Sequence, residues 1–245
     1  MKHITSQDIK VLSSQTDMNC EMGLMQTLSI VQDNMCDYFK DLKCDGPHLI
    51  PECGCFYVLT KTKIHMDECA KWGDVFNIST GLHDLSKIAV TVSSNLKNNN
   101  DKIFAKCYQE LCAMDVSSRR LRMVGTTPFP TDLEMTGNRD KVFEKFNIEY
   151  GESDLIDSIK IKSTNIDIYH HTNNVEYVRF MLATLDKEFF MQNKITDFEI
   201  HYSAESKYGD VLRIFKKEIG DEIFFELRRE NNKVTTKAKL KFTKR

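Results

Sequence analysis

The feature that most constrains this chain is an order of elements that occurs twice, marked each time by the same short motif. Lys71-Trp72-Gly73-Asp74-Val75 in the first half resembles Lys207-Tyr208-Gly209-Asp210-Val211 in the second half. Each copy comes after a helical pattern and then a strand pattern. A match of aromatic-Gly-Asp-Val is weak by itself, but the same order of elements around it indicates an internal duplication.

The first half predicts one strand, one long helix and then four strands. An alternating stretch at 8–18 precedes a methionine-rich helical stripe at 19–43, for which Asp17 or Asn19 is a candidate cap. Gly46-Pro47 predicts the end of that helix. The strand patterns that follow occupy residues 55–66, 75–80, 86–94 and 102–115.

The second half predicts the same order. A strand pattern at 158–168 precedes a helical pattern at 174–192. Further strand patterns occupy residues 195–204, 211–219, 222–230 and 233–243. We therefore expect an α+β fold in which each half has a long central helix wrapped by an antiparallel β-sheet.

The stretch between the halves changes character. Residues 126–156 contain Pro128 and Pro130 and then mixed charge without a clean period, which is typical of a linker. The expected division is a first unit at 1–127, a linker at 128–156 and a second unit at 157–245.

The composition excludes several classes of protein. With 41% hydrophobic and 29% charged residues the chain is expected to be globular, and a net charge of −2 gives no reason to expect a nucleic-acid partner. The first residues have no apolar core of the kind found in a signal peptide, and no apolar run approaches the ~18 residues that span a bilayer. We expect a cytoplasmic protein without a membrane partner.

The eight cysteines give no metal-binding pattern. None of them forms Cys-x-x-Cys, and Cys53-Gly54-Cys55 is too tight for the usual zinc spacing. In the cytosol these thiols are expected to be reduced. We therefore expect no metal and no cofactor, with most cysteines acting as small buried apolar residues.

The stretch with the most candidate catalytic residues is 167–175, at the predicted corner from strand to helix. It holds Asp167, His170 and His171, and then Asn173 and Asn174 at the helix start. The first N–H groups of a helix are unpaired and carry partial positive charge. An acid and an imidazole beside them could polarise a carbonyl and move a proton. Each residue also has a structural interpretation, since Asp and Asn are common cap and turn residues.

The chain resembles the acyl-ACP thioesterases, where ACP is acyl carrier protein, over nearly its whole length. In the first half, 71–75 and 114–121 look like segments of that family. In the second half, Asp167, His171, Asn173 and Asn174 fit the family's pattern of Asp, any, Asn, any, His, any, Asn, Asn. The family also has a glutamate 34 residues after the histidine, and Glu205 stands there.

Three positions depart from related patterns. Tyr169 replaces the family's asparagine, and Ser206 replaces the cysteine that usually follows the glutamate. Single-hotdog thioesterases carry a similar loop with a glycine where this chain has His170. The length of the chain and its duplication favour the acyl-ACP thioesterases as the closer family.

The resemblance implies a double hotdog fold and hydrolysis of the thioester bond of fatty acyl-ACP. Its catalytic residues would be Glu205 as general base, His171 to orient the water or polarise the thioester, and Asp167 to position His171 or share the base role. The Tyr169 hydroxyl can donate one hydrogen bond there. Asn173 and Asn174 would belong to the substrate-binding residues, and backbone donors at the helix start beside them would stabilise the oxyanion. A Ser206–His171 nucleophile pair is a minor alternative.

The first half has no matching set, because its corner at 17–21 contains no histidine. We expect its cavity to hold the acyl chain, while the second half carries the chemistry. The candidate substrate-binding residues there are Met22 and Met25, with Leu28, Ile30, Phe56 and Val58 as further candidates.

The expected partner is an acidic acyl carrier protein, docked on basic residues. Arg119-Arg120-Leu121-Arg122 is the densest basic cluster, with Lys216-Lys217 and Arg228-Arg229 as others. The sequence leaves a homodimer open. The alternatives are an acyl-CoA thioesterase of the hotdog type and a non-catalytic acyl-binding hotdog protein.

Overall fold

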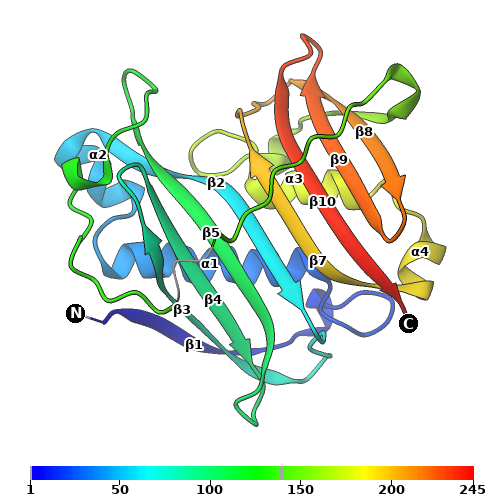
Figure 1. Ribbon diagram of the computed structural model, residues 1–245, viewed down its shortest axis with the longest axis horizontal. Helices are drawn as coiled ribbons and strands as arrows, with labels where there is room; N and C mark the ends of the chain where they lie inside the picture. The colour runs from blue at the N-terminus through cyan, green and yellow to red at the C-terminus, as the bar shows by residue number, and fades with distance from the viewer. Residues whose placement is uncertain (1, 138–140) are drawn as a thin grey trace. The chain divides into compact units, whose positions relative to one another are not determined.

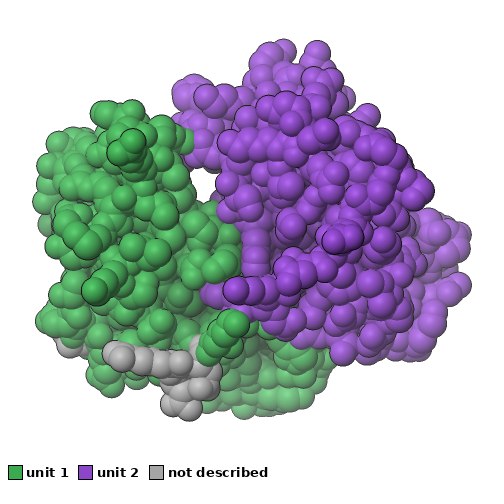
Figure 2. Space-filling view, turned by 45° about the horizontal axis from the view of Figure 1, so that its top comes forward, with its two compact units in different colours: residues 1–142 green, residues 143–245 purple. Residues whose placement is uncertain are grey.

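The computed structural model describes residues 2–137 and 141–245, which divide into two compact units. The N-terminal unit comprises Met1–Val142 and the C-terminal unit comprises Phe143–Arg245, as coloured in Figure 2. Each unit combines one antiparallel sheet with a helix laid on it. No helix in the described ranges is long and apolar enough to cross a membrane.

The N-terminal unit has its strands in the order β1-β3-β4-β5-β2. Its elements are β1 (Ile4–Lys10), α1 (Leu24–Asp41), α2 (Gly46–Cys53), β2 (Cys55–Met66), β3 (Val75–Leu85), β4 (Ala89–Lys97) and β5 (Ile103–Asp115). The strands pair antiparallel throughout this order. The predicted order of strand, helix and four strands is therefore confirmed, with α2 as an addition.

The central helix α1 crosses one face of this sheet, as Figure 1 shows. Met35, Tyr38 and Phe39 on α1 join a buried cluster with residues of α2 and of four strands. Phe129 and Leu133 belong to the same cluster, so the first part of the stretch predicted as a linker packs into the core of the N-terminal unit. Apolar side chains buried in this way stabilise a fold by about 1.5–3 kcal/mol each.

The C-terminal unit has its strands in the order β7-β10-β9-β8-β6. Its elements are β6 (Leu155–Lys160), α3 (Asn174–Leu182), α4 (Lys187–Gln192), β7 (Asn193–Tyr202), β8 (Val211–Ile219), β9 (Glu222–Arg229) and β10 (Val234–Lys244). All neighbouring strands in this order pair antiparallel. The bounds predicted for β8 are the observed ones.

The duplicated motif makes the same turn in both units. Gly73 and Gly209 have φ values of 90° and 88°, a region that favours glycine. The Asp74 carbonyl accepts the Val11 amide at 2.9 Å, and the Asp210 carbonyl accepts the Ile161 amide at 2.8 Å. Equivalent hydrogen bonds at equivalent places confirm the internal duplication.

The beginning of α1 corrects the sequence prediction. The helix begins at Leu24, five residues after the predicted start, and Gly23 caps it without a side-chain hydrogen bond. Neither Asp17 nor Asn19 is the cap, because the Asp17 carboxylate holds a turn before the helix. The helix ends at Asp41, before Gly46 and Pro47, and these two residues instead open α2, where proline is tolerated in the first turn.

Two elements of the C-terminal unit were also predicted wrongly. The helix predicted at 174–192 is broken into α3 and α4, because the Asp186 carboxylate accepts the Phe189 amide at 2.7 Å and starts a new helix. The strand predicted at 158–168 ends at Lys160. A 3₁₀ turn and an irregular loop follow, and Ile168 in that loop is 81% exposed.

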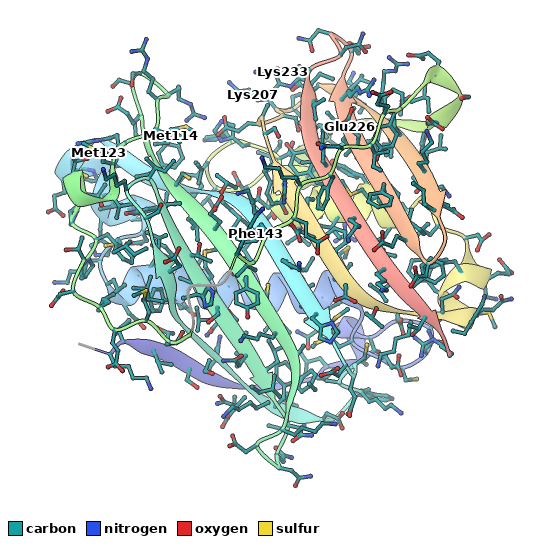
Figure 3. All side chains as sticks on the ribbon, viewed as in Figure 1. Met114, Met123, Phe143, Lys207, Glu226 and Lys233 are labelled. Atoms are coloured by element: carbon teal, nitrogen blue, oxygen red, sulfur yellow. The ribbon has the colours of Figure 1, made fainter. Side chains whose placement is uncertain are left out.

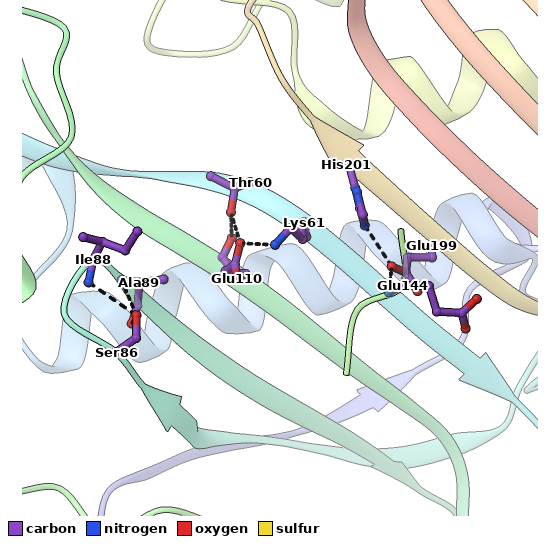
Figure 4. A network of polar contacts seen from close by, with 9 residues as sticks. All are labelled: Thr60, Lys61, Ser86, Ile88, Ala89, Glu110, Glu144, Glu199 and His201. Atoms are coloured by element: carbon purple, nitrogen blue, oxygen red, sulfur yellow. Dashed lines mark hydrogen bonds and ion pairs between the residues drawn. The ribbon is translucent and has the colours of Figure 1, made fainter. Parts of the chain in front are cut away.

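Residues 143–154, which we call the strap, cross the C-terminal sheet on the side opposite α3; Figure 1 shows α3 behind the sheet and the strap in front of it. The Glu144 amide donates to the carboxylate of Glu199 at 2.7 Å. The His201 ring lies 2.8 Å from the same carboxylate, as Figure 4 shows. The Phe146 ring stacks on His201 at 4.6 Å. The strap thereby gives the buried Glu199 a backbone donor.

We predict that Phe146→Ala lowers the free energy of unfolding of the C-terminal unit by about 1–2 kcal/mol, because it removes the ring stacked on His201. Urea unfolding followed by circular dichroism measures the effect. Lys145→Ala is the matched control, since Lys145 is exposed on the same segment. Equal stability of the two variants would contradict a stabilising role for the strap.

Candidate active site

Asp167 shapes the loop that precedes α3. One oxygen of its carboxylate accepts the Tyr169 amide at 2.9 Å and the His171 amide at 3.2 Å. Its own amide donates to the His171 carbonyl at 2.8 Å. His170 has a φ of 63°, the left-handed conformation that explains why related loops have glycine here. Asp167 therefore positions the backbone of His171.

The N-terminal unit makes the same turn with different side chains. The Asp17 carboxylate accepts the Asn19 amide at 2.8 Å and the Glu21 amide at 3.3 Å, and Cys20 has a φ of 59°. By this pattern Asn19 is equivalent to Tyr169, and Glu21 is equivalent to His171. The turn is thus a feature of the scaffold and does not by itself mark an active site.

The structure brings His171 and Glu205 together in the C-terminal unit. The imidazole Nε2 lies 3.3 Å from a carboxylate oxygen of Glu205, and the two side chains are 20% and 35% exposed. The pair is therefore partly accessible to solvent and to a substrate. Two of the three residues expected to lie together in the site, 34 residues apart in the chain, are in contact.

Backbone hydrogen bonds hold the segment that carries Glu205. The Ser203 and Ala204 amides donate to the Thr235 carbonyl at the start of β10. The Thr172 amide, next to His171, donates to the Ser206 carbonyl at 3.0 Å. Figure 3 shows Lys207, which follows this segment, at the same end of the sheet as Lys233. The candidate site thus lies at the end of the sheet where β7 ends and β10 begins.

The two asparagines at the helix start have separate structural roles. The Asn173 side chain caps α3 by accepting the Val175 amide at 3.0 Å, and its carbonyl accepts the Glu176 amide at 2.9 Å. The Asn174 carbonyl accepts the hydroxyl of Tyr202 at 3.2 Å. Of the first three backbone amides of α3, only that of Asn174 has no hydrogen-bond acceptor among the described residues. The helix start therefore offers fewer backbone donors than the sequence suggested.

Ser206 is fully buried and is engaged with other hydroxyls. Its Oγ lies 2.8 Å from the Thr172 hydroxyl and 2.7 Å from the Tyr177 hydroxyl. Burial raises the pKa of the Tyr177 phenol above its ordinary value, and hydrogen bonding with Ser206 offsets part of that rise. The phenol therefore stays protonated at neutral pH. These contacts speak against Ser206 as a nucleophile paired with His171.

Thr172 and Tyr177 were not among the site residues predicted from the sequence. The available signal was a tyrosine at a position of α3 that the helical pattern places toward the core, since a buried phenol needs a hydrogen-bond partner. Tyr169, by contrast, is 38% exposed on the loop. The structure places its backbone in the turn held by Asp167.

Met22 and Met25 lie in the N-terminal unit, where α1 begins. Met22 is 1% exposed and its amide donates to the Ala70 carbonyl at 2.7 Å, while Met25 is partly buried in the first turn of α1. A pocket of about 400 Å³ in this unit is lined by neither methionine. Its walls include Glu68, Phe76 and Phe104. In the described part of the chain, no group of three His, Cys, Asp or Glu residues could hold a metal ion.

Two family models match the two halves of the chain. The acyl-ACP thioesterase N-terminal domain matches residues 2–127, and the acyl-ACP thioesterase C-terminal domain matches residues 148–244. The chain belongs to the acyl-ACP thioesterase family. The resemblance expected from Asp167, His171 and Glu205 is therefore confirmed at the level of the family.

Two curated relatives of this family come from the plant Cuphea viscosissima. The chloroplastic acyl-[acyl-carrier-protein] hydrolase FATB3 is 20% identical over 218 residues, covering 84% of this chain and 53% of the relative. The chloroplastic hydrolase FATB1 is 22% identical over 164 residues, covering 64% of this chain and 39% of the relative. The chain thus spans about half the length of the curated relatives it matches, or less.

Solved structures of acyl-ACP thioesterases share the fold of the whole chain. An acyl-ACP thioesterase from Bacteroides thetaiotaomicron superposes with a TM-score of 0.86 at 18% identity, covering 98% of both chains. The 12:0-ACP thioesterase from Umbellularia californica superposes with a TM-score of 0.82 at 14% identity, covering 99% of this chain and 98% of that one. These similarities confirm the double hotdog fold of the acyl-ACP thioesterase family.

We predict that Asp167→Ala lowers the free energy of unfolding by about 1–2 kcal/mol, because two loop amides lose their acceptor. Asp167→Asn keeps an acceptor oxygen, so its expected loss is a few tenths of a kcal/mol. Urea unfolding of both variants measures the difference. Asp17→Ala and Asp17→Asn make the same two changes in the equivalent turn of the N-terminal unit, and they serve as the matched comparison. Full stability of Asp167→Ala would contradict the turn as described.

Proposed function

We propose that this chain hydrolyses the thioester bond of fatty acyl-ACP and releases a free fatty acid and the carrier thiol. The observation that carries the proposal is the contact between His171 and Glu205, 3.3 Å apart, in the C-terminal unit of a member of the acyl-ACP thioesterase family. A carboxylate beside an imidazole in a partly exposed site supplies a base for water and a donor for the substrate.

In the proposed reaction Glu205 takes a proton from a water molecule while the oxygen of that water attacks the thioester carbon. His171 orients that water or donates to the carbonyl oxygen. The negative charge that develops on this oxygen is stabilised by the Asn174 amide at the positive end of α3. When the tetrahedral intermediate collapses, the carbon–sulfur bond breaks and the proton held by Glu205 passes to the leaving thiolate. Atoms and charge balance without a cofactor.

The remaining candidate residues have supporting roles in this proposal. Asp167 holds the backbone of His171 through the turn described above. Asn173 caps the helix whose amide binds the oxyanion. Met22 and Met25 contribute to the acyl-chain site assigned to residues 1–127, with 157–245 as the catalytic part. This division, the linker at 128–156, the cytoplasmic location and the homodimer stay predictions.

The ion pairs of the structure narrow the choice of docking residues for the acidic carrier protein. Lys216 and Lys217 are paired with Glu218 and Asp154. Arg228 and Arg229 are likewise paired, with Glu226 and Asp210. The turn at 117–120 after β5 is the better candidate because both of its arginines, Arg119 and Arg120, are exposed.

We predict that Glu205→Gln and His171→Asn each lower kcat for acyl-ACP hydrolysis by about 10²–10⁴-fold, the usual contribution of a general base or acid. Release of the carrier thiol from a panel of acyl-ACP substrates measures the rate. Cys69→Ser is the control, because Cys69 precedes Ala70 in the N-terminal unit as Glu205 precedes Ser206. Unchanged rates in both site variants would contradict the assignment of Glu205 and His171 as catalytic residues.

The same panel separates the alternatives. Equal acyl groups offered on carrier protein and on CoA show which carrier the site accepts, and faster CoA hydrolysis would replace the proposal with an acyl-CoA thioesterase. Acyl binding without release of thiol from either carrier would establish a non-catalytic acyl-binding protein.

Tyr169 gives a second test of the mechanism. Its equivalent in the N-terminal unit is Asn19, so the turn accepts the asparagine that the family has here. We predict that Tyr169→Phe lowers kcat about 3- to 10-fold without changing KM, because a hydrogen bond to the water or thioester is lost. Tyr169→Asn restores the rate to the wild-type level or above. If Tyr169→Phe hydrolyses at the wild-type rate, the phenol takes no part.

A further inference from the structure

We propose that Thr172, Ser206 and Tyr177 form a network that fixes the separation of His171 and Glu205, with Ser206 as its central positioning residue. Ser206 follows Glu205 in the chain, and Thr172 follows His171. The Ser206 hydroxyl bonds to both other hydroxyls, at 2.8 Å to Thr172 and 2.7 Å to Tyr177. The inference rests on the proposed function and assigns a role to residues that do not touch the substrate.

Counting protons gives a direction to every hydrogen bond in this network. The Thr172 hydroxyl donates to the Ser206 carbonyl at 3.1 Å, so its single proton is used. The Ser206 hydroxyl must then donate to Thr172, and the Tyr177 hydroxyl must donate to Ser206. The Tyr177 oxygen in turn accepts the Ser206 amide at 3.0 Å. Each hydroxyl donates once and accepts once, and no polar group of the network is left unsatisfied.

The network lies where no regular element holds the site. Residues 170–172 and 203–207 lie outside helices and strands, and the side chains of His171 and Glu205 are partly exposed. Packing alone therefore does not fix their separation. Tyr177 belongs to α3, and its ring contacts Tyr202 at the end of β7 with a centroid distance of 5.9 Å. The network thus ties both loops to the helix and the sheet.

The N-terminal unit provides an internal comparison. The Met22 amide donates to the Ala70 carbonyl at 2.7 Å, which is the same backbone bond as that between Thr172 and Ser206. The side chains at these two positions are apolar, and both residues are buried. The scaffold therefore forms this junction without hydroxyls. The hydroxyl network occurs in the half that has the His–Glu pair, which supports a role in that pair's geometry.

The test uses substitutions that remove one hydroxyl at a time. Ser206→Ala and Tyr177→Phe are expected to lower kcat for acyl-ACP hydrolysis roughly 10- to 100-fold with little change in KM, because small misplacements of reacting groups are costly. Thr172→Ser keeps its hydroxyl and should retain most of the rate, whereas Thr172→Val should not. Thr184→Val is the matched control, because it removes a partly buried hydroxyl that donates to the Met181 carbonyl at 2.7 Å in the same unit.

A double-mutant cycle separates positioning from simple stability. If Ser206 acts through Glu205, Ser206→Ala has no further effect on the residual rate of Glu205→Gln. A full additional loss in that background would overturn the proposal, as would a wild-type rate in both Ser206→Ala and Tyr177→Phe.

A readout without turnover distinguishes failure of this inference from failure of the proposed function. Crystal structures of wild type and Ser206→Ala give the distance from His171 Nε2 to Glu205, which is expected to lengthen or become variable in the variant. If the wild type hydrolysed no thioester, the proposed function would fail, and this distance alone would decide the role of the network. An unchanged 3.3 Å contact in Ser206→Ala would overturn it.

Discussion

One backbone hydrogen bond in each unit ties the loop before the helix to the loop that follows the first long strand after it. The bond joins Met22 to Ala70 in the N-terminal unit and Thr172 to Ser206 in the C-terminal unit. All four residues are buried, so an amide or carbonyl left without a partner would cost roughly 1–3 kcal/mol. The backbones of the residues just before each partner are therefore held near one another. In one half this places Glu21 near the chain at Cys69, and in the other it places His171 beside Glu205.

Comparing the two units thus distinguishes features of the common scaffold from side chains that occur in one unit. The Asp17 and Asp167 turns, with left-handed residues at Cys20 and His170, have the same hydrogen bonds, so they belong to the scaffold. What differs is the set of side chains mounted on it. The C-terminal unit has an imidazole and a carboxylate with a satisfied hydroxyl network behind them. A buried polar network of this kind adds little net stability, but it specifies one arrangement of the groups that it joins.

Local patterns predicted the strands well because alternation and flanking turns are local properties. The bounds of β2 and β8 were predicted as observed, and each lies between clear turn residues. The pattern failed where one polar residue changed the outcome. Asp186 interrupts an apolar period that continues to Phe189, and its carboxylate starts a new helix. An apolar alternation through Ile166 and Ile168 suggested a strand, but Asp167 between them binds two amides and turns the chain.

Only part of the candidate site could be predicted, because its contacts are not local in the sequence. The contact of His171 with Glu205 depends on two segments meeting across the fold, and only the family spacing of 34 residues pointed to it. In the family pattern Ser206 stands where a cysteine usually follows the glutamate. From the sequence, the replacement therefore meant the loss of a possible thiol nucleophile. The structure gives that position a different meaning, because a serine hydroxyl makes short hydrogen bonds to Thr172 and Tyr177 that a thiol, with its longer and weaker bonds, cannot match. A serine after the glutamate is then compatible with an active site, provided that a threonine and a tyrosine stand where this chain has them.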